Sequence, residues 1–238
     1  MNEVSLFSGY CGFTLGLKLA GIQTRTVLYC ENEPYCQEII RARVREGILD
    51  DAPIWPDVRT LDGSCFAGKV GIITAGFPCQ PHSVAGQRRG EADERNLWPD
   101  TLRLIREVGA RFVLLENVPG VLANGYGGTV IGQLSEIGYD CIWDCVSASA
   151  VGASHHRSRW WLLAYPYGEG LERIYQASGR KHLQSTPRNL PRYEWNPTPR
   201  VCRKSDGIAH RMDRIRACGN GIVPAVVKQF LRIISNDL

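Results

Sequence analysis

The sequence has no apolar run long enough to cross a membrane, and it does not start like an exported protein. Its longest apolar stretches, such as 112–115 and 160–164, fall far short of the roughly 18 residues that a spanning helix needs. The first ten residues, MNEVSLFSGY, carry neither a basic segment nor an apolar core of the kind that directs secretion. We therefore expect an intracellular, cytoplasmic protein with no membrane partner.

The cysteines lack the spacing of a disulfide framework or a metal site. Their number is nine, which is odd, and no CxxC pair occurs. Cys141 and Cys145 form the only close pair, in a stretch that we expect to be a strand, where packing on one face explains them as well as metal binding would. His155 and His156 have no partners at metal-ligand spacing. Most cysteines are therefore interpreted as small buried thiols, and no metal is expected.

Composition is ordinary for a folded domain, but charge is unevenly distributed. Hydrophobic residues make up 44% of the 238 residues and charged residues 22%, which excludes wholesale disorder and predicts one large domain with at most a small appendage. Net charge is +4, yet residues 151–218 alone carry 13 Lys and Arg against 5 Asp and Glu. A polyanion docking on this basic third is one interpretation, and a solvated basic face is the other.

Short apolar runs alternate with amphipathic stretches of helical length over the first 164 residues. This alternation predicts a doubly wound α/β sheet, whose ligands lie beyond the carboxyl ends of the strands. From about 165 to 203 the pattern stops, and five of the 13 prolines fall there, which indicates a loop-rich insertion. The expected strands are 4–7, 26–30, 70–75, 112–116, 142–147 and 160–164, and the expected helices are 13–20, 33–46, 97–108, 130–137 and 223–234.

A glycine-containing turn follows the first strand and indicates a nucleotide-like cofactor. In residues 7–12, FSGYCG, glycine allows close approach of the backbone to a ligand, although an ordinary tight turn is the alternative because the full GxGxxG pattern is missing. Glu31 stands at the end of the second strand, where an acidic residue holds ribose hydroxyls. Asp57 and Val58 lie where they can contact an adenine edge. Each carboxylate alone is more often a helix cap.

Cys79 and Glu116 stand at the ends of two buried strands. Cys79 lies in Gly76-Phe77-Pro78-Cys79-Gln80-Pro81, where the prolines rigidify a turn at the sheet edge that carries chemistry in α/β enzymes, so a thiolate nucleophile is favoured over a structural thiol. Glu116 follows four apolar residues, so we expect partial burial, a raised pKa and the ability to donate a proton, with a helix cap as the alternative.

Two arginines, Arg157 and Arg159, precede the strand at 160–164. Alternate residues of an extended segment point the same way, so both can reach one anion or carbonyl. The alternative is a charged strand entry on the surface.

Taken in order, these motifs resemble those of the DNA (cytosine-5)-methyltransferases. The resemblance covers residues 4–164 and 206–230, and the GFPCQ and ENV elements are its most specific parts. Its motifs are FSGYCGF, ENEPY, PDVRTLD, GFPCQPHSVAGQRRG, RNLWPD, ENVPG, GASHHRSRWW and GNGIVP.

The resemblance implies a Rossmann-like S-adenosylmethionine-dependent methyltransferase sheet and a residue-by-residue mechanism. Cys79 would add to C6 of a flipped-out cytosine, Glu116 would contact N3 and the exocyclic amine, and Asn117 would place that loop. Arg157 and Arg159 would hold the base carbonyl and order the catalytic loop, which matches 83–90. The residues implied in the cofactor pocket are Phe7, Gly9, Gly12, Glu31, Asn32, Asp57, Val58, Phe77, Pro78, Leu97 and Asn220.

The implied organisation is a catalytic domain at 1–164, a short target-recognition region at 165–205 and a C-terminal segment at 206–238 that returns to pack near the first helix. Double-stranded DNA is the implied partner of a monomer, within restriction-modification as the usual setting of such enzymes. Candidate phosphate contacts are Arg188, Arg192, Arg200, Arg203 and Lys204, and Tyr193 and Trp195 either touch bases or, as we favour, hold the region together.

Three departures from the family pattern bear on function. Cys11 stands where a second glycine is usual and is expected to crowd the methionine end of the cofactor. Ser154 and Ser158 replace a proline and a glutamate around the arginines. The recognition region is short, so we predict a short or relaxed target sequence, since each good base contact contributes only about 1–3 kcal/mol of discrimination. Mapping a defined site of five or more bases would contradict this.

Two alternatives remain at this point, and a third is set aside. A catalytically silent relative that binds DNA or cofactor is favoured only by Cys11 and the short recognition region. An RNA-directed enzyme keeps the chemistry and changes the substrate. An NAD-linked dehydrogenase rests on the first glycine turn alone and leaves residues 76–80 unexplained.

Overall fold

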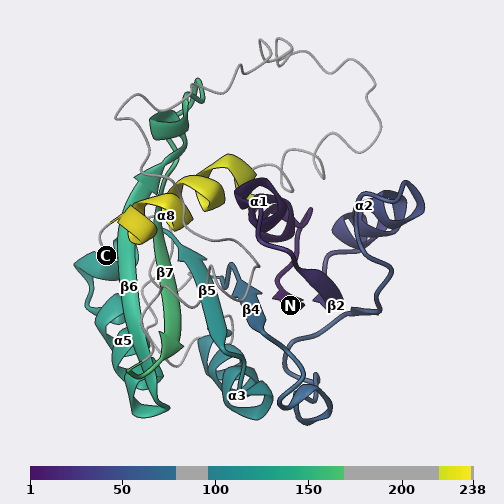
Figure 1. Cartoon of the computed structure of the whole chain (residues 1–238), viewed down its shortest axis with the longest axis horizontal. Helices are drawn as coiled ribbons and strands as arrows, with labels where there is room; N and C mark the ends of the chain where they lie inside the picture. The colour runs from purple at the N-terminus through teal and green to yellow at the C-terminus, as the bar shows by residue number, and fades with distance from the viewer. Residues whose placement is uncertain (79–95, 169–219, 237–238) are drawn as a thin grey trace.

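A seven-stranded sheet forms the centre of the protein (Figure 1). The computed structural model describes residues 1–78, 96–168 and 220–236. The strand order is β3-β2-β1-β4-β5-β7-β6; the first five of these are parallel, and β7 runs antiparallel to both β5 and β6. The strands are β1 (Asn2–Leu6), β2 (Arg25–Cys30), β3 (Ile54–Trp55), β4 (Ile72–Ala75), β5 (Phe112–Asn117), β6 (Tyr139–Ser147) and β7 (Ser158–Pro166).

The helices cover both faces of this sheet, as the alternating pattern predicts. Helices α3, α4 and α5 pack on one face, whereas α1 and α8 pack on the other. The α-helices are α1 (Gly12–Ala20), α2 (Pro34–Arg45), α3 (Trp98–Val108), α4 (Gly120–Ala123), α5 (Tyr126–Glu136) and α8 (Pro224–Asn236), and short 3-10 turns lie at Ser64–Phe66 and Ala148–Val151.

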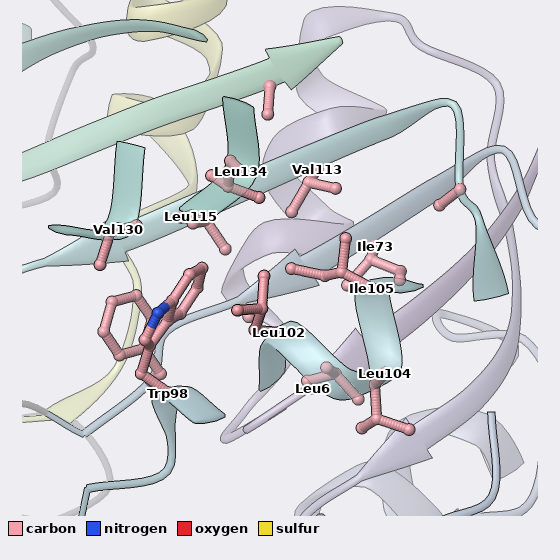
Figure 2. Packing of buried hydrophobic residues seen from close by; sticks show 14 of the residues in the cluster. Leu6, Ile73, Trp98, Leu102, Leu104, Ile105, Val113, Leu115, Val130 and Leu134 are labelled. Atoms are coloured by element: carbon pink, nitrogen blue, oxygen red, sulfur yellow. The ribbon is translucent and has the colours of Figure 1, made fainter. Parts of the chain in front are cut away.

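One hydrophobic cluster fills the space between the sheet and α3 to α5 (Figure 2). Ile105 of α3 and Leu134 of α5 are fully buried against Ile73, Val113 and Leu115 of the strands. Truncating one of these side chains to alanine costs about 2–5 kcal/mol in a core of this kind. The ends of β4 and β5 are therefore held rigidly relative to one another.

The opposite face is closed by the C-terminal helix, which lies beside the first helix (Figure 1). Phe230 of α8 stacks on Trp161 of β7, with ring centroids 6.1 Å apart, and Phe13 of α1 meets the same indole edge-on. Gly16 leaves room for Val227, because a Cβ at this glycine would lie 2.4 Å from the valine Cβ. The predicted return of the C-terminal helix to the first helix is thereby confirmed.

Strand β5 is buried along its whole length, including its two polar residues. Six consecutive residues, from Phe112 to Asn117, are inaccessible because helices cover both faces of the parallel part of the sheet. The apolar residues 112–115 form a buried strand, and Glu116 and Asn117 at the end of this strand are therefore buried as well. Since β7 runs antiparallel to β5, the first residues of β7 lie beside the last residues of β5.

Every strand and helix expected from the sequence is present, with shifted ends. The pattern missed β3, which has only two residues, and it began α5 at Val130, whereas the helix starts at Tyr126. The catalytic domain was expected to end at 164, and β7 ends two residues later, at Pro166. Residues 169–219 lie outside the described part, so the boundary at 205 stays a prediction.

The prediction that most cysteines are buried holds only for some of them. The structure describes six cysteines, all as free thiols: Cys11, Cys30 and Cys36 are buried, Cys141 is half-buried, and Cys65 and Cys145 are exposed. The last two stand on a short 3-10 turn and on β6, the outermost strand of the sheet. Among the described residues, no helix is both long and apolar enough to cross a membrane.

Candidate active site

The loop after β1 and the end of β2 are joined through the Glu31 carboxylate. Gly9 donates its backbone N–H to Glu31 Oε2 at 2.7 Å, and Glu33 donates its own to Oε1 at 2.8 Å. Burial raises the pKa of Glu31, and these two N–H groups partly oppose the rise by stabilising the charged form. Gly9 adopts a φ of +54°, and no atom lies within 4 Å of the position a Cβ would take. The loop backbone is therefore open to a ligand there.

Cys11 occupies a backbone conformation that favours glycine. Its φ is 64° and its ψ is 39°, in the left-handed region, at the residue that caps α1. The side chain is buried in a small cluster with Tyr29, Ile40 and Leu49. Burial also raises the pKa of the thiol. The sulfur therefore packs between the loop and α2, where it acts as a core atom.

The buried Glu116 and the half-buried Arg159 form an ion pair where β5 and β7 meet. Arg159 Nε lies 2.9 Å from Glu116 Oε1. Glu116 is 7% exposed. The antiparallel register explains the pair, because Glu116 stands opposite Trp161 and Arg159 lies two residues nearer the start of β7 on the same face. The carboxylate is thus a paired site group, and the helix-cap alternative is wrong.

The pKa of Glu116 is raised to about 7. Burial is the largest cause, and the charges of Arg159 and Arg157 oppose it. Near neutral pH this carboxyl group is thus poised between its protonated and charged forms, which is the requirement for a group that donates and recovers a proton. The raised pKa expected from the apolar run before Glu116 is confirmed.

Asn117 ties the end of β5 to the turn that follows β4. Its side-chain nitrogen donates to the backbone carbonyl of Phe77 at 3.1 Å, and its oxygen accepts the N–H of Val118 at 2.8 Å. A Cβ on Gly76 would lie 3.5 Å from Glu116 Oε2, so the carboxyl group lies close to the turn. The ring of Phe77 packs on Trp98 of α3 at 5.1 Å. Residues 76–78, which lead into Cys79, are therefore fixed beside Glu116.

Arg157 does not have the extended geometry expected of it. Its φ is +32°, so the chain turns before β7 begins, and its guanidinium donates to the carbonyl of Gly221 at 2.6 Å. Burial and the neighbouring charge of Arg159 lower the pKa of Arg157. Arg159 forms an ion pair with Glu116, and the charge of Arg157 also lowers the pKa of Glu116. The expectation that both arginines point the same way from an extended segment is wrong at this residue.

Residues just before α8 pack against the loop after β1. The Tyr10 hydroxyl donates to the Ile222 carbonyl at 2.5 Å. A Cβ on Gly12 would lie 2.3 Å from the same carbonyl oxygen, and a Cβ on Gly221 would fall on the Tyr10 ring. Both glycines are thus required for close approach of two chain segments. Sequence reasoning missed Tyr10 and Ile222, because no local pattern joins residues 212 positions apart.

Asp57 is engaged by its own neighbour. Arg59 Nε and Nη2 donate to the Asp57 carboxylate at 2.9–3.2 Å, and the Arg59 N–H donates to it at 3.0 Å. These bonds lower the pKa of Asp57. Val58, next to it, is buried in the main hydrophobic cluster, and Leu97 packs at the edge of the same cluster.

Some of the remaining predicted residues are described by the structure and some are not. Among those described, Phe77 is buried, Phe7, Pro78 and Leu97 are half-buried, and Asn32 and Asn220 are exposed. Cys79, the loop at 83–90 and every candidate phosphate contact lie outside the described residues. Within the residues described, no group of three His, Cys, Asp or Glu side chains is arranged to hold a metal ion.

In this sheet an antiparallel β7 lies between β5 and β6. That strand order defines the Rossmann-like fold of S-adenosylmethionine-dependent methyltransferases. The family model described as C-5 cytosine-specific DNA methylase matches residues 1–202. The chain therefore belongs to this family.

Similar proteins agree with this assignment. The chain is 30% identical over 229 residues to the type II methyltransferase M.CviJI of Paramecium bursaria Chlorella virus IL3A, covering 95% of this chain and 57% of that protein. It is 32% identical over 162 residues to M.NgoMIV of Neisseria gonorrhoeae, covering 66% and 49%. The chain thus spans about half the length of these curated relatives.

Solved structures show the same fold at lower identity. A DNMT2 variant from Spodoptera frugiperda superposes with a TM-score of 0.58 and 19% identity, over 70% of this chain and 50% of that one. The S. pombe Dnmt2 methyltransferase gives 0.57 and 23%, over 76% and 57%.

Proposed function

We propose that this chain is a DNA cytosine-5 methyltransferase, which transfers a methyl group from S-adenosylmethionine to C5 of a flipped-out cytosine in double-stranded DNA through a covalent adduct with Cys79. The observation that carries the proposal is Glu116: a buried carboxyl group with a pKa of about 7, paired with Arg159 and close to the turn that leads into Cys79. Membership of the cytosine-5 family supplies the base and the acceptor atom.

The residues at the strand ends fit S-adenosylmethionine. Glu31 has each carboxylate oxygen bound to one backbone N–H, which leaves lone pairs on both for ribose hydroxyls. Gly9 leaves open space beside the loop backbone, and the half-buried Leu97 offers apolar surface for an adenine ring. The Cys11 side chain is buried in a core cluster with Tyr29, Ile40 and Leu49, which favours an active enzyme over a silent relative.

When bound, S-adenosylmethionine supplies an electrophilic methyl group. The Cys79 thiolate forms a bond to C6 of cytosine while protonated Glu116 donates to N3, so that the electron pair reaches C5 instead of remaining as charge on the ring. After C5 is methylated and loses its proton to a base, the S–C6 bond breaks and N3 returns its proton to Glu116. Arg159 stabilises the carboxylate during the interval in which Glu116 is charged.

DNA enters this scheme as the partner of the basic segment at 151–218. A cytosine inside a duplex is out of reach of Cys79, so the base has to leave the stack before reaction. Phosphate contacts from this segment predict binding that weakens steeply as salt rises. Monomeric state, cytoplasmic location and a short target sequence stay predictions.

The test is base-resolution cytosine-methylation sequencing of plasmid DNA from a methylation-deficient bacterium that expresses the full chain. Cys79→Ala should abolish methylation. Cys65→Ala, an exposed cysteine on a 3-10 turn, is the matched control and should leave methylation unchanged. Methylation that persists in Cys79→Ala would contradict the proposed nucleophile. Methylation of transfer RNA but not of DNA by the purified protein would favour the RNA-directed alternative.

A further inference from the structure

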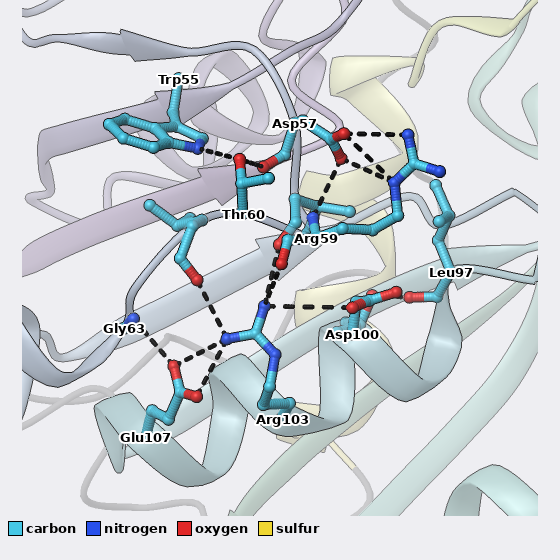
Figure 3. Close-up of polar contacts among 12 residues, drawn as sticks. Trp55, Asp57, Arg59, Thr60, Gly63, Leu97, Asp100, Arg103 and Glu107 are labelled. Atoms are coloured by element: carbon cyan, nitrogen blue, oxygen red, sulfur yellow. Dashed lines mark hydrogen bonds and ion pairs between the residues drawn. The ribbon is translucent and has the colours of Figure 1, made fainter.

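Arg103 of α3 binds a run of backbone carbonyls in the segment that follows β3 (Figure 3). Its Nη1 donates to the Leu61 carbonyl at 2.9 Å, and its Nη2 donates to the carbonyls of Val58 and Arg59 at 3.0 and 3.4 Å. A guanidinium offers five N–H donors in a fixed plane, so one side chain can satisfy several carbonyls that no strand or helix satisfies. Arg103 thus fixes the path of residues 58–61.

Glu107, one turn further along α3, completes the attachment. Its carboxylate accepts from Arg103 Nη1 at 2.9 and 3.0 Å and from the Gly63 N–H at 2.8 Å. A Cβ on Gly63 would lie 2.8 Å from the Glu107 carboxylate, so the glycine is required for this close approach. The two side chains therefore bind both ends of the segment 58–63: Arg103 donates to three carbonyls, and Glu107 accepts one N–H.

The same helix also carries the opposite side of the predicted adenine pocket. Leu97 is the residue that caps α3, and Thr101 holds it by donating its hydroxyl to the Leu97 carbonyl at 2.7 Å. Val58 and Leu97 thus belong to chain segments far apart in sequence, and Arg103 connects the first to the helix that begins at the second. This arrangement fixes the position of residues 57 and 58 relative to Leu97, where the predicted adenine pocket lies.

We propose that Arg103, with Glu107, is a positioning residue that sets the affinity of the protein for S-adenosylmethionine by fixing Asp57 and Val58 relative to Leu97. The proposal rests on the proposed function, because it assigns a role within the same cofactor pocket. The backbone carbonyls that Arg103 binds lie outside the Glu116 site. Loss of Arg103 should therefore weaken cofactor binding and leave the chemical step intact.

The experiment is isothermal titration of the full chain with S-adenosylmethionine, together with steady-state methylation of DNA. Arg103→Met keeps the aliphatic stem and removes all donors, and Arg106→Met makes the same change at an exposed residue of the same helix. We expect Kd and KM for the cofactor to rise about tenfold in Arg103→Met, the equivalent of losing about one hydrogen bond to a charged group. The kcat at saturating cofactor and the KM for DNA should stay at wild-type values, and Arg106→Met should bind like wild type.

Arg103→Lys is the second variant, since it keeps the charge but cannot reach carbonyls on both sides, and it should give an intermediate Kd. It decides the question in the same assay if Arg103→Met does not fold. A lower melting temperature with an unchanged Kd would overturn the proposal, because Arg103 would then only stabilise the fold. Failure of the wild-type chain to bind S-adenosylmethionine would overturn the proposed function itself, whereas wild-type binding with equal binding by the folded variants overturns this proposal alone.

Discussion

Protonation of Glu116 makes a measurable contribution to the stability of the folded protein. Its pKa is about 7 in the folded state, against an ordinary value of 4.5. The folded protein therefore binds more protons than the unfolded chain between these two values, and its free energy of unfolding falls as pH rises through that window. A shift of this size corresponds to about 3 kcal/mol, fully present below pH 4.5 and lost by about pH 7 to 8.

Glu116→Gln isolates this effect, because the amide resembles the protonated acid and does not titrate. Glu3 and Glu31 also have raised pKa values, so the pH profile of one protein alone sums several groups, and the difference between wild type and variant removes the others. We expect wild type to lose about 3 kcal/mol relative to Glu116→Gln between pH 4.5 and 8, measured by urea unfolding at half-unit intervals.

A change at Arg159 gives a second test of the raised pKa of Glu116. Because its charge lowers the pKa of Glu116, Arg159→Met should move the pH-dependent loss to higher pH. A stability difference between wild type and Glu116→Gln that varies by less than about 1 kcal/mol over this range would refute the reasoning, since Glu116 would then titrate like an exposed carboxylate.

Two further predictions concern the contact between the loop after β1 and the residues before α8. Gly12→Ala should destabilise the protein by about 1–3 kcal/mol in urea unfolding, because its Cβ would lie 2.3 Å from the Ile222 carbonyl oxygen. Gly132→Ala in α5 is the control: its Cβ would have no atom within 4 Å, so this change should stabilise the protein by about 0.5–1 kcal/mol. Equal effects of the two would contradict the close approach. Tyr10→Phe should cost about 1 kcal/mol by removing one hydrogen bond to Ile222, and a melting temperature identical to wild type would speak against that bond.

The sheet and its helices were predictable because each apolar run ends in turn residues at the right length. Residues 112–115 are the clearest case: four apolar residues followed by Glu116 predict both a buried strand and a carboxyl group with a raised pKa, and both are confirmed. Strand β3 was missed because two residues flanked by proline give no periodic signal.

The contacts that organise the site were not predictable, because they join residues far apart in the chain through backbone atoms. The turn at Arg157 depends on a hydrogen bond to Gly221, 64 residues later, and the local pattern of an extended strand entry gave the wrong geometry. Arg103 and Glu107 have the spacing of an ordinary helical ion pair, and nothing in that spacing indicates that the pair also binds a separate segment.

The Tyr10–Ile222 contact also bears on the order of folding. Closing a loop of 212 residues carries an entropic cost that local helices and hairpins avoid, so we expect this contact to form late in folding. During synthesis, β1 and its loop leave the ribosome long before α8, and until then the apolar surface of α1 that faces Val227 and Phe230 stays uncovered. A nascent chain therefore contains the sheet and the loop after β1 before it contains α8, the helix that packs against α1.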